Sequence, residues 1–395
     1  MNDQPSHPLI PRYSTNEYDE EALAERRRWV EQAAGVNLPM IGQGKIPAAS
    51  MRGNVENAIG AVQMPLGIAG PLLVRGEHAQ GVFYVPLATT EGALVRSYER
   101  GMALLTRAGG AEVRIERDEN QISPTFHFAG VGKAAAFGRF TADHIGDLRQ
   151  CAEATTSHGK LLAVEPMVVG RDVIVVFRYH TGDAHGMNMI AKATDAACRW
   201  LVENSDADSY VLFSGLSAEK RPSTRGLLGG KGKKVTAGAE IPAKWVHLYL
   251  HTTPEALREL WRKTITGNIM AGAIGYCGHY ANGLAALFIA CGQDVANVAN
   301  SVVGLTSFEV TPEGNLYASC TLSSLVVATV GGGVDLGTSR ECLALLGCHG
   351  SGKARKLAEI VAATALAGEL SLAAALASGE FVAAHETFGR NRPST

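Results

Sequence analysis

Residues Val85–Thr106, VPLATTEGALVRSYERGMALLT, join an apolar strand-like run to a long helical pattern at a lone carboxylate, Glu91. The apolar positions after it recur three and four residues apart, at Leu94, Tyr98, Met102 and Leu105. This is the period of an α-helix with one buried stripe. Thr89 and Thr90 supply hydroxyls suited to the helix start, where the helix dipole also favours an acid. The local pattern leaves open whether Glu91 is an ordinary first-turn acid or a functional carboxylate.

Composition describes a soluble globular chain. Its 395 residues are 46% hydrophobic and 19% charged, which is enough to bury a large core and favours two or more domains. The formal net charge of −2 and the pI near 6.6 create no field that attracts nucleic acid or an anionic membrane. A nucleic-acid partner is therefore not expected.

The cysteines indicate a reducing compartment. There are seven, an odd number, with no CxxC pair and mostly within apolar runs. Buried reduced thiols fit this pattern better than disulfides or a metal site, so we expect a cytoplasmic protein without a metal. The N-terminus has no basic start followed by an apolar core, and the apolar window Gly283–Cys291 is far shorter than the roughly 20 residues that span a bilayer. Neither export nor a membrane anchor is predicted.

The N-terminal part divides into three segments. Met1–Tyr13 is rich in proline and predicts a loose arm, and Ser14–Ala34 predicts a charged helix that ends at Gly35. Glu56–Leu73 mixes glycine and proline with aliphatic residues. We interpret it as a buried but irregular segment that supports a site or an interface.

Between about Thr125 and Phe213 the pattern changes to short β-like runs that alternate with amphipathic helical patterns. The strands are expected at Val173–Phe177 and Tyr210–Phe213, and the helices at Asp143–Thr155 and Thr194–Val202. This alternation predicts a compact α+β insert.

Two glycine-rich stretches are candidate ligand contacts. Gly182–Ile190, GDAHGMNMI, joins a strand to a helix and lets backbone amides meet a phosphate, although a turn capped by Asp183 fits equally well. Thr329–Leu336, TVGGGVDL, suits close approach to a flat or phosphorylated ligand, with a glycine hinge as the alternative. The candidate cofactor contacts are Asp183, Gly186, Met187, Asn188, Gly331 and Gly332.

Basic residues cluster after the insert. Lys220 and Arg221 lie side by side in SGLSAEKRP, and Lys233, Lys234 and Lys244 follow. A solvated loop is the plain interpretation, but together these groups suit an anionic ligand. Gly352-Lys353 is not a P-loop, because Ala354 follows the lysine, so ATP binding is not expected.

The C-terminal half adds two isolated groups. Asp294 follows the apolar run Met270–Cys291, where an acid at a helix C-terminus opposes the dipole, so we expect a role beyond solubility. His385 lies in the polar tail after an alanine-rich helix, Ala354–Ser378, and titrates near neutral pH.

Taken together, the motifs resemble the hydroxymethylglutaryl-CoA reductase family in its soluble archaeal and eukaryotic type. They occur in the family's order across about residues 52–385, as ENAIG, MPLGIAGPL, PLATTEG, GDAHGMNM, SAEKRP, IPAK, GQD, TVGGG, AGELSLAAALASG and the terminal histidine. PLATTEG with GQD and AGELSL is highly specific.

The resemblance implies an α+β fold. A large domain (51–122 and 214–395) is built around a central helix and binds the acyl-CoA, while an inserted ferredoxin-like domain (123–213) binds NADPH, with NADH possible. Residues 1–50 form an N-terminal arm and helix. A homodimer or higher homo-oligomer is implied. The implied reaction converts HMG-CoA to mevalonate with two hydrides and releases coenzyme A. The second hypothesis is a related reductase that acts on another acyl thioester. The third hypothesis is a binding protein that kept the fold without the activity.

Four catalytic positions carry over, as Glu91, Lys220, Asp294 and His385. Lys220 would stabilise the oxyanion formed by the first hydride, by about 3–4 kcal/mol, and Asp294 would keep it charged. His385 would protonate the departing thiolate, and Glu91 the aldehyde oxygen. The implied acyl-CoA contacts are Ser97, Arg100, Ser214, Arg221, Lys233 and Lys244.

Several positions depart from the family's pattern. Ile122 stands where an arginine holds the substrate carboxylate, so we expect either that Arg221, Lys244 and Ser214 replace that clamp or that Ile122 contacts an apolar acyl group. Thr264 stands where an asparagine touches the acyl site. Thr156-Ser157 replaces the Ser-Arg pair that meets the 2′-phosphate of NADPH, which leaves His158 or Lys160.

Overall fold

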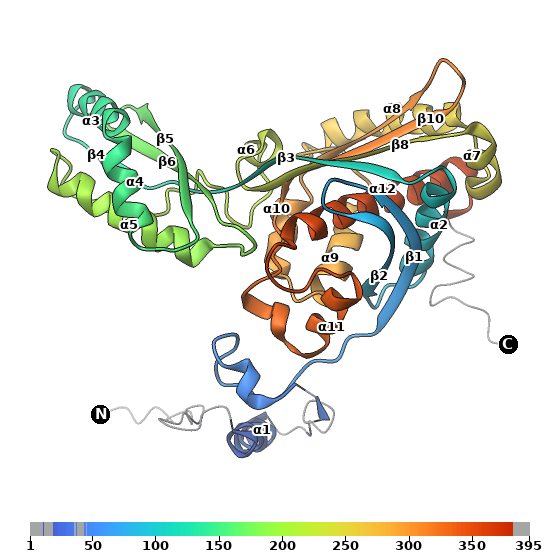
Figure 1. The fold of residues 1–395 in the computed structure, drawn as a ribbon, viewed down its shortest axis with the longest axis horizontal. Helices are drawn as coiled ribbons and strands as arrows, with labels where there is room; N and C mark the ends of the chain where they lie inside the picture. Colours follow the sequence, from blue (N-terminus) through green and yellow to red (C-terminus); the bar gives the residue numbers. More distant parts are fainter. Residues whose placement is uncertain (1–10, 12–18, 35–36, 38–42, 45, 382–395) are drawn as a thin grey trace, which may run out of the picture.

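The computed structural model describes residues 11, 19–34, 37, 43–44 and 46–381, and His385 lies outside these ranges. The described chain forms a small lobe and a large lobe, with an N-terminal helix apart from both (Figure 1). Helices and strands are mixed throughout, which confirms the α+β prediction.

The small lobe is the insert, drawn in green in Figure 1. Its helices are α3 (Val131–Asp143), α4 (Ile145–Glu153) and α5 (Met187–Glu203), and its strands are β4 (Thr125–His127), β5 (Lys160–Val169), β6 (Asp172–His180) and β7 (Tyr210–Val211). It has its own apolar core, whose buried residues run from Ile122 to Ala207 and include Phe126, Phe137 and Phe177. Burial of this apolar core stabilises the lobe.

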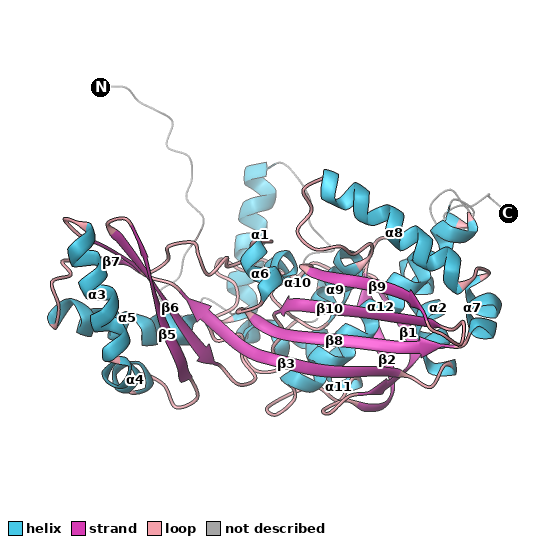
Figure 2. Cartoon of the chain, turned by 90° about the horizontal axis from the view of Figure 1, so that it is seen from above, coloured by secondary structure: helices cyan, strands magenta, loops and turns pink. Residues whose placement is uncertain are grey.

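One strand passes through both lobes. The first part of β3 (Ala111–Ile122) pairs with β8 (Gly232–Ile241) of the large lobe, while Asn120, Gln121 and Ile122 at its end pair with β6 of the small lobe. Figure 2 shows this long strand bridging the two parts. Residues near its end therefore lie between the lobes.

The large lobe packs helices on a twisted sheet. Besides β3 and β8 its strands are β1 (Leu66–Arg75), β2 (Gln80–Ala88), β9 (Gly304–Val310) and β10 (Leu316–Leu325), in the order β3, β8, β10, β9, with β1 pairing β2 and β3. Its helices are α2 (Leu94–Arg107), α6 (Thr224–Leu228), α7 (Ala243–Leu250), α8 (Pro254–Met270), α9 (Tyr280–Ala290), α10 (Val298–Ser301), α11 (Gly337–Leu345) and α12 (Ala354–Ser378). Short 3₁₀ turns are η3 (Val295–Asn297) and η4 (Gly332–Asp335).

Helices α2 and α12 form the centre of the large lobe. The predicted stripe of α2 is confirmed, since Leu94, Tyr98, Met102 and Leu105 are all buried. A Cβ at Gly101 would lie 1.9 Å from the carbonyl oxygen of Ala367, so only glycine lets the two helices approach this closely. The predicted span of α12 is also confirmed.

Helix α12 is long and apolar enough to cross a membrane by composition, which the sequence analysis overlooked. However, 83% of its most apolar window is buried inside the fold. It is the core helix of the large lobe, and its apolar character follows from contact with protein on all sides.

Two expectations about local structure were wrong. Helix α2 begins at Leu94 rather than at the threonines, because Ala93 has a left-handed φ of +68° that interrupts the helical path. The hydroxyl of Thr89 instead accepts the N–H of Glu91. The segment Glu56–Leu73 is neither buried nor irregular throughout, since residues 62–66 are exposed and β1 starts at Leu66.

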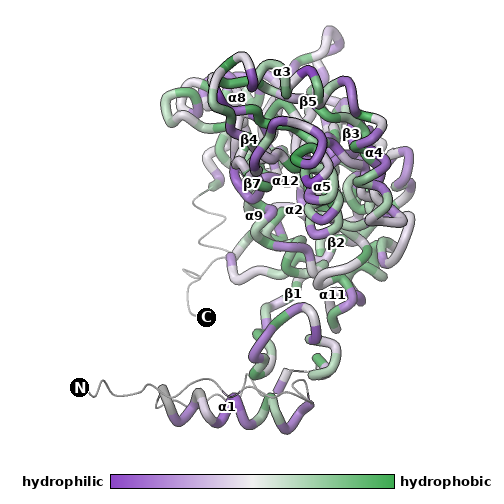
Figure 3. Tube along the Cα trace, turned by 90° about the vertical axis from the view of Figure 1, so that its left-hand side faces the viewer, coloured by the Kyte–Doolittle hydropathy of each residue, from purple (hydrophilic) through white to green (hydrophobic). Residues whose placement is uncertain are grey.

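The N-terminal helix α1 (Glu20–Ala34) stands apart from the main body (Figure 3). It packs on η2 (Ala48–Met51) through a small cluster that includes Leu23 and Met51. Arg26 is fully buried there, and its Nη1 donates to the carbonyl of Ala58 at 3.1 Å. This contact fixes the helix to the start of the segment that leads into β1.

Candidate active site

Lys220 and Asp294 form an ion pair, with 2.8 Å between Nζ and Oδ2. Each side chain is less than half exposed. The backbone N–H of Lys220 donates to Asn300 Oδ1 at 2.7 Å, and the Asn300 amide donates back to the carbonyls of Ala218 and Arg221. Asn300 therefore fixes the loop in which Lys220 adopts a left-handed φ of +53°.

The dipole argument for Asp294 was wrong, although the expected pairing with Lys220 is present. Helix α9 ends at Ala290, and Asp294 instead caps η3 by accepting the N–H of Ala296 at 3.1 Å. A carboxylate at a helix start is favoured rather than penalised. The sequence analysis missed the turn between α9 and η3, in which Gly292 adopts a φ of +62°.

The pair lines a cavity of about 900 Å³ between the lobes. Both predicted glycine-rich stretches meet there: Gly186, Met187 and Asn188 from the insert, and Gly331 and Gly332 from the large lobe. A Cβ at either Gly331 or Gly332 would meet open space, so their backbone is accessible to a ligand. The start of α5, a helix of 17 residues, also faces this cavity.

Asp183 does not line this cavity. Its carboxylate accepts the backbone N–H groups of Gly352 and Ala354 at 2.7 and 3.0 Å. Asp183 thus caps α12 and connects the insert to the large lobe. This agrees with the predicted capping role of Asp183 and not with a ligand contact.

A buried polar network that the sequence analysis missed lies behind Lys220. Lys231 is 2% exposed, forms an ion pair with Glu219, and donates to Asn120 Oδ1 at 3.1 Å. The Asn120 amide donates to the carbonyl of His185 at 2.8 Å. Burial lowers the pKa of His185 to about 4, although Glu219 opposes the shift. The only signal for Lys231 was its place beside Lys233.

Several expected acyl-CoA contacts lie elsewhere. Lys233 is buried and its Nζ is 3.1 Å from Asp118, and Lys244 lies over the ring of Trp245 at 5.0 Å. Neither lines the cavity of the Lys220–Asp294 pair. The backbone of Ser214 donates to the carbonyl of Ser123 at 3.0 Å, beside the end of β3.

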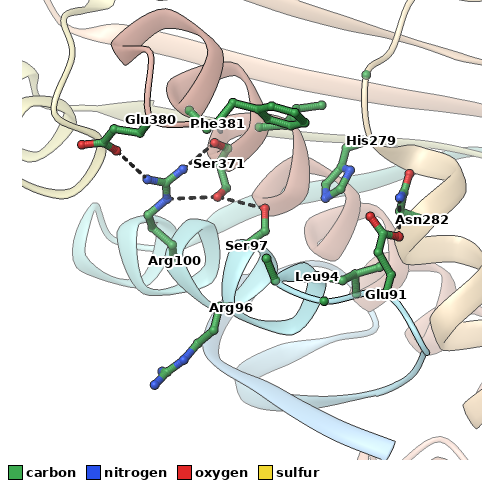
Figure 4. Close-up of a pocket in the computed structure, with 15 residues that line it drawn as sticks. Glu91, Leu94, Arg96, Ser97, Arg100, His279, Asn282, Ser371, Glu380 and Phe381 are labelled. Atoms are coloured by element: carbon green, nitrogen blue, oxygen red, sulfur yellow. Dashed lines mark hydrogen bonds and ion pairs between the residues drawn. The ribbon is translucent and has the colours of Figure 1, made fainter. Parts of the chain in front are cut away.

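Glu91 belongs to a second cavity, of about 380 Å³ (Figure 4). Its Oε2 accepts a hydrogen bond from Asn282 Nδ2 at 2.7 Å. Nearby, His279 stacks on Tyr98 with 4.9 Å between ring centroids. Burial lowers the pKa of His279 to about 4, although Glu91 opposes the shift. In the described chain Glu91 itself is exposed.

Ser97 and Arg100, both predicted acyl-CoA contacts, line the same cavity on α2. Arg100 donates to Ser371 through Nε at 3.0 Å and Nη2 at 2.7 Å, and Ser97 Oγ donates to Ser371 Oγ at 3.1 Å (Figure 4). Ser371, on α12, was missed, because the sequence does not say which turn of α12 faces α2.

Thr264, the position matched to the family's acyl-site asparagine, does not line the cavity that contains Glu91. Thr264 lies on α8, donates to the carbonyl of Trp261 at 2.9 Å and lines a third cavity. Asn282 contacts Glu91 instead. It follows His279 by three residues across the start of α9, which places both side chains on one face.

Ile122 was also misplaced by the sequence analysis. It is fully buried in the apolar core of the small lobe and pairs with Phe177 of β6. It lines neither cavity. The interpretation that puts its side chain against an apolar acyl group is therefore wrong for this structure.

The four carried-over catalytic positions do not meet within the described part of one chain. Glu91 lines one cavity, Lys220 and Asp294 line the other, and the two linings share no residue. The fourth position, His385, lies outside the described residues.

Comparison with known proteins identifies relatives along nearly the whole chain. The family described as hydroxymethylglutaryl-coenzyme A reductase matches residues 22–390. The chain is 43% identical over 374 residues to the 3-hydroxy-3-methylglutaryl-coenzyme A reductase of Methanothermobacter thermautotrophicus, which covers 94% of each. It is 44% identical over 380 residues to the protein of that name from Haloferax volcanii, again covering 94% of each.

Solved structures of lower identity share the fold. The class II 3-hydroxy-3-methylglutaryl-CoA reductase from Streptococcus pneumoniae, bound to NADPH in open conformations, aligns with a TM-score of 0.68 and 20% identity. The alignment covers 92% of this chain and 100% of that one.

Proposed function

The chain belongs to the hydroxymethylglutaryl-coenzyme A reductase family, and on that basis we propose that its two cavities serve one reaction, the NAD(P)H-dependent reduction of HMG-CoA to mevalonate with release of coenzyme A. The main support for the proposal is that the Lys220–Asp294 ion pair and the two glycine-rich stretches line the same cavity. A related reductase acting on another acyl thioester is the alternative, because position 122 holds no cation.

The cavity between the lobes fits a nicotinamide dinucleotide. Gly331 and Gly332 leave backbone accessible, and the start of α5 presents N–H groups that suit a phosphate. When bound, the dinucleotide supplies the hydride. Met187 and Asn188 would hold it on the insert side.

Lys220 is the group that stabilises the oxyanion when the thioester carbonyl is reduced. A preorganised cation at that point is worth about 3–4 kcal/mol, by analogy with other oxyanion donors. Asp294 orients the ammonium group, and Asn300 fixes the loop that carries it. Lys220 therefore acts from a rigid support rather than from a mobile loop.

Glu91 serves as the proton donor of the second reduction, and Asn282 orients its carboxyl group. A carboxyl group donates a proton near neutral pH only if it is shielded from water. Glu91 is exposed in the described chain, so it needs a cover. His385 remains the proposed donor to the coenzyme A thiolate.

A second copy of the chain is the proposed cover. Large apolar side chains stand exposed beside Glu91 on β1, on β2 and just before them, at Val62, Met64, Leu66, Ile68, Val82 and Tyr84. Such a patch marks an interface in a soluble protein. We propose a homodimer in which Glu91 of one chain faces Lys220 of its partner, because the two groups lie in separate cavities of one chain.

Mixing two inactive variants tests this arrangement. Mixed dimers of a Glu91→Ala chain and a Lys220→Ala chain should show about half of wild-type activity, because each mixed dimer has one intact site out of two. Purification through two different tags, followed by steady-state assay, measures the recovery. Mixed dimers that stay inactive would show that both groups act within one chain.

NADPH is the proposed cofactor, with NADH also accepted. Thr156 uses its hydroxyl to accept the backbone N–H groups of His158 and Gly159, and Lys160 is paired with Glu153 at 2.8 Å. No arginine stands in this segment to bind a 2′-phosphate. Discrimination between the two dinucleotides should therefore be weak.

We expect kcat/KM for NADPH and NADH to differ by less than about tenfold with HMG-CoA as substrate, since one charge-assisted hydrogen bond is worth roughly that factor. Nicotinamide absorbance on mixing gives both values. Glu153→Gln frees Lys160 and should shift the ratio toward NADPH. A preference above a hundredfold in the wild type would contradict the expectation, and no oxidation of either dinucleotide would favour another acyl thioester.

The chain is proposed to work in the cytoplasm. All seven cysteines are free, and each is buried or half-buried. Such thiols suit a reducing compartment.

A further inference from the structure

The cavity that contains Glu91 has two chemically different ends. Figure 4 shows Glu91 with Asn282 at one end, and Arg100 with Ser371 and Glu380 at the other. In the proposed reaction Glu91 gives a proton to the aldehyde oxygen, so the acyl end of the substrate lies beside it. The phosphate groups of an acyl-CoA are separated from the acyl group by the pantetheine arm. A substrate that extends along the cavity therefore brings them to the Arg100 end.

Arg100 presents one charged donor at that end. Ser371 fixes its guanidinium by two hydrogen bonds, from Nε at 3.0 Å and from Nη2 at 2.7 Å. The remaining nitrogen, Nη1, faces Glu380 Oε2 at 3.5 Å. Arg96 also belongs to the lining but is paired with Glu99 on its own helix, and Figure 4 shows its side chain directed away from Arg100. Nη1 of Arg100 is thus the charged donor that an incoming anion meets.

Glu380 is anchored by a second contact. Its Oε1 lies 2.8 Å from Nδ1 of His251, the residue that caps the end of α7. The hydrogen bond with His251 lowers the pKa of Glu380, so the carboxylate is charged near neutral pH. The 3.5 Å between Arg100 and Glu380 is within ion-pair range but too long for a strong hydrogen bond. A better acceptor can therefore displace Glu380 from Arg100.

A phosphate group is such an acceptor. It carries negative charge on several oxygens, and a guanidinium donates to it at short distance. The free protein supplies a carboxylate in its place. Burial lowers the pKa of Arg100, and Glu380 opposes this shift by stabilising the charged form. Glu380 and a phosphate therefore compete for the same nitrogen, Nη1.

We propose that Glu380 is a specificity-determining residue that occupies the Arg100 guanidinium in the free protein and so weakens the binding of the phosphate groups of coenzyme A. This inference rests on the proposed function, which brings an acyl-CoA to this cavity. An acyl group carried on pantetheine alone has no phosphate and does not compete with Glu380. Glu380 thus reduces the preference of the enzyme for acyl-CoA over acyl-pantetheine.

Glu380→Gln tests the proposal, because the amide keeps the shape of the side chain and removes the competing charge. The Kd of coenzyme A, measured by titration calorimetry, should fall about two- to fivefold, which is the range for a partly exposed ion pair. The KM for HMG-CoA should fall by a similar factor with kcat unchanged. The KM for the corresponding thioester of pantetheine should stay at the wild-type value.

A double-mutant cycle shows whether the effect passes through Arg100. In an Arg100→Gln background, Glu380→Gln should leave the Kd of coenzyme A almost unchanged, because the guanidinium for which the two anions compete is absent. An undiminished effect in that background would mean that Glu380 merely repels the phosphates, and would overturn the proposal.

Glu259→Gln is the matched control. Glu259 pairs with Arg262 at 2.7 Å on α8, and its side chain is 44% exposed, against 40% for Glu380. It lines neither the cavity of Glu91 nor that of the Lys220–Asp294 pair. The variant removes one carboxylate charge of similar exposure elsewhere and should keep the wild-type Kd of coenzyme A.

The outcomes separate this inference from the proposed function. A wild type that binds coenzyme A but does not reduce HMG-CoA overturns the proposed function, while the Kd values still decide the role of Glu380. A wild type that reduces HMG-CoA, with the Kd of coenzyme A unchanged in Glu380→Gln, overturns the inference alone. An equal fall in KM for the pantetheine thioester also overturns it, because that substrate has no phosphate.

Discussion

Lys220→Ala is expected to lower kcat for the reduction of HMG-CoA by about 10²-fold or more, because the oxyanion of the first reduction loses its preorganised cation. Dinucleotide binding should remain nearly intact, since the groups proposed to hold the dinucleotide lie on α5 and at Gly331 and Gly332. The backbone of the loop should also persist, because Asn300 binds main-chain atoms rather than the lysine side chain.

Stopped-flow absorbance in a single turnover measures the first hydride transfer, and fluorescence titration with NADPH measures binding. Lys263→Ala is the control, because Lys263 is an exposed lysine that pairs with Glu259 on its own helix. A Lys220→Ala enzyme that keeps more than about a tenth of the rate would remove Lys220 from the oxyanion role.

Ile122→Arg is expected to unfold or severely loosen the small lobe, not to improve substrate binding. Ile122 is fully buried in that apolar core, and an unpaired buried charge there costs about 3–5 kcal/mol. The large lobe has a separate core, so its stability should decrease less than that of the small lobe. Activity should fall because the cavity proposed to bind the dinucleotide loses the wall that carries Gly186–Asn188.

Denaturant unfolding and limited proteolysis of the insert measure the effect. Ile122→Val removes one methylene group without adding charge and should cost only about 0.5–1.5 kcal/mol. If Ile122→Arg keeps wild-type stability and lowers the KM for HMG-CoA, the side chain at 122 faces the substrate and the assignment to the core is wrong.

The sequence by itself determined the features that depend on local pattern. The stripe of α2 and the full span of α12 follow from apolar residues at helical spacing, which a few turns of chain specify alone. The two glycine-rich stretches were found in the same way, because only glycine permits certain backbone conformations. The order of the motifs was enough to identify the family, whose match covers residues 22–390.

The tertiary structure decided where individual side chains point and what they pair with. One interpretation of the sequence placed Ile122 against the substrate, but the pairing of β3 with β6 turns its side chain into the small lobe, while Gln121 contacts Arg225. Asp294 followed an apolar run in sequence, but a turn at Gly292 made it the cap of the next helix and the partner of Lys220.

Long-range packing also decides which basic side chains are paired with a carboxylate. Lys231, Lys233 and Arg225 look alike in sequence, and only contacts with residues up to 115 positions away show that two are neutralised and one is not. The division of Glu91 and Lys220 between two cavities is likewise invisible in sequence, where both were predicted to serve one site. Strand register and ion pairing arise from long-range packing, which no local pattern of residues encodes.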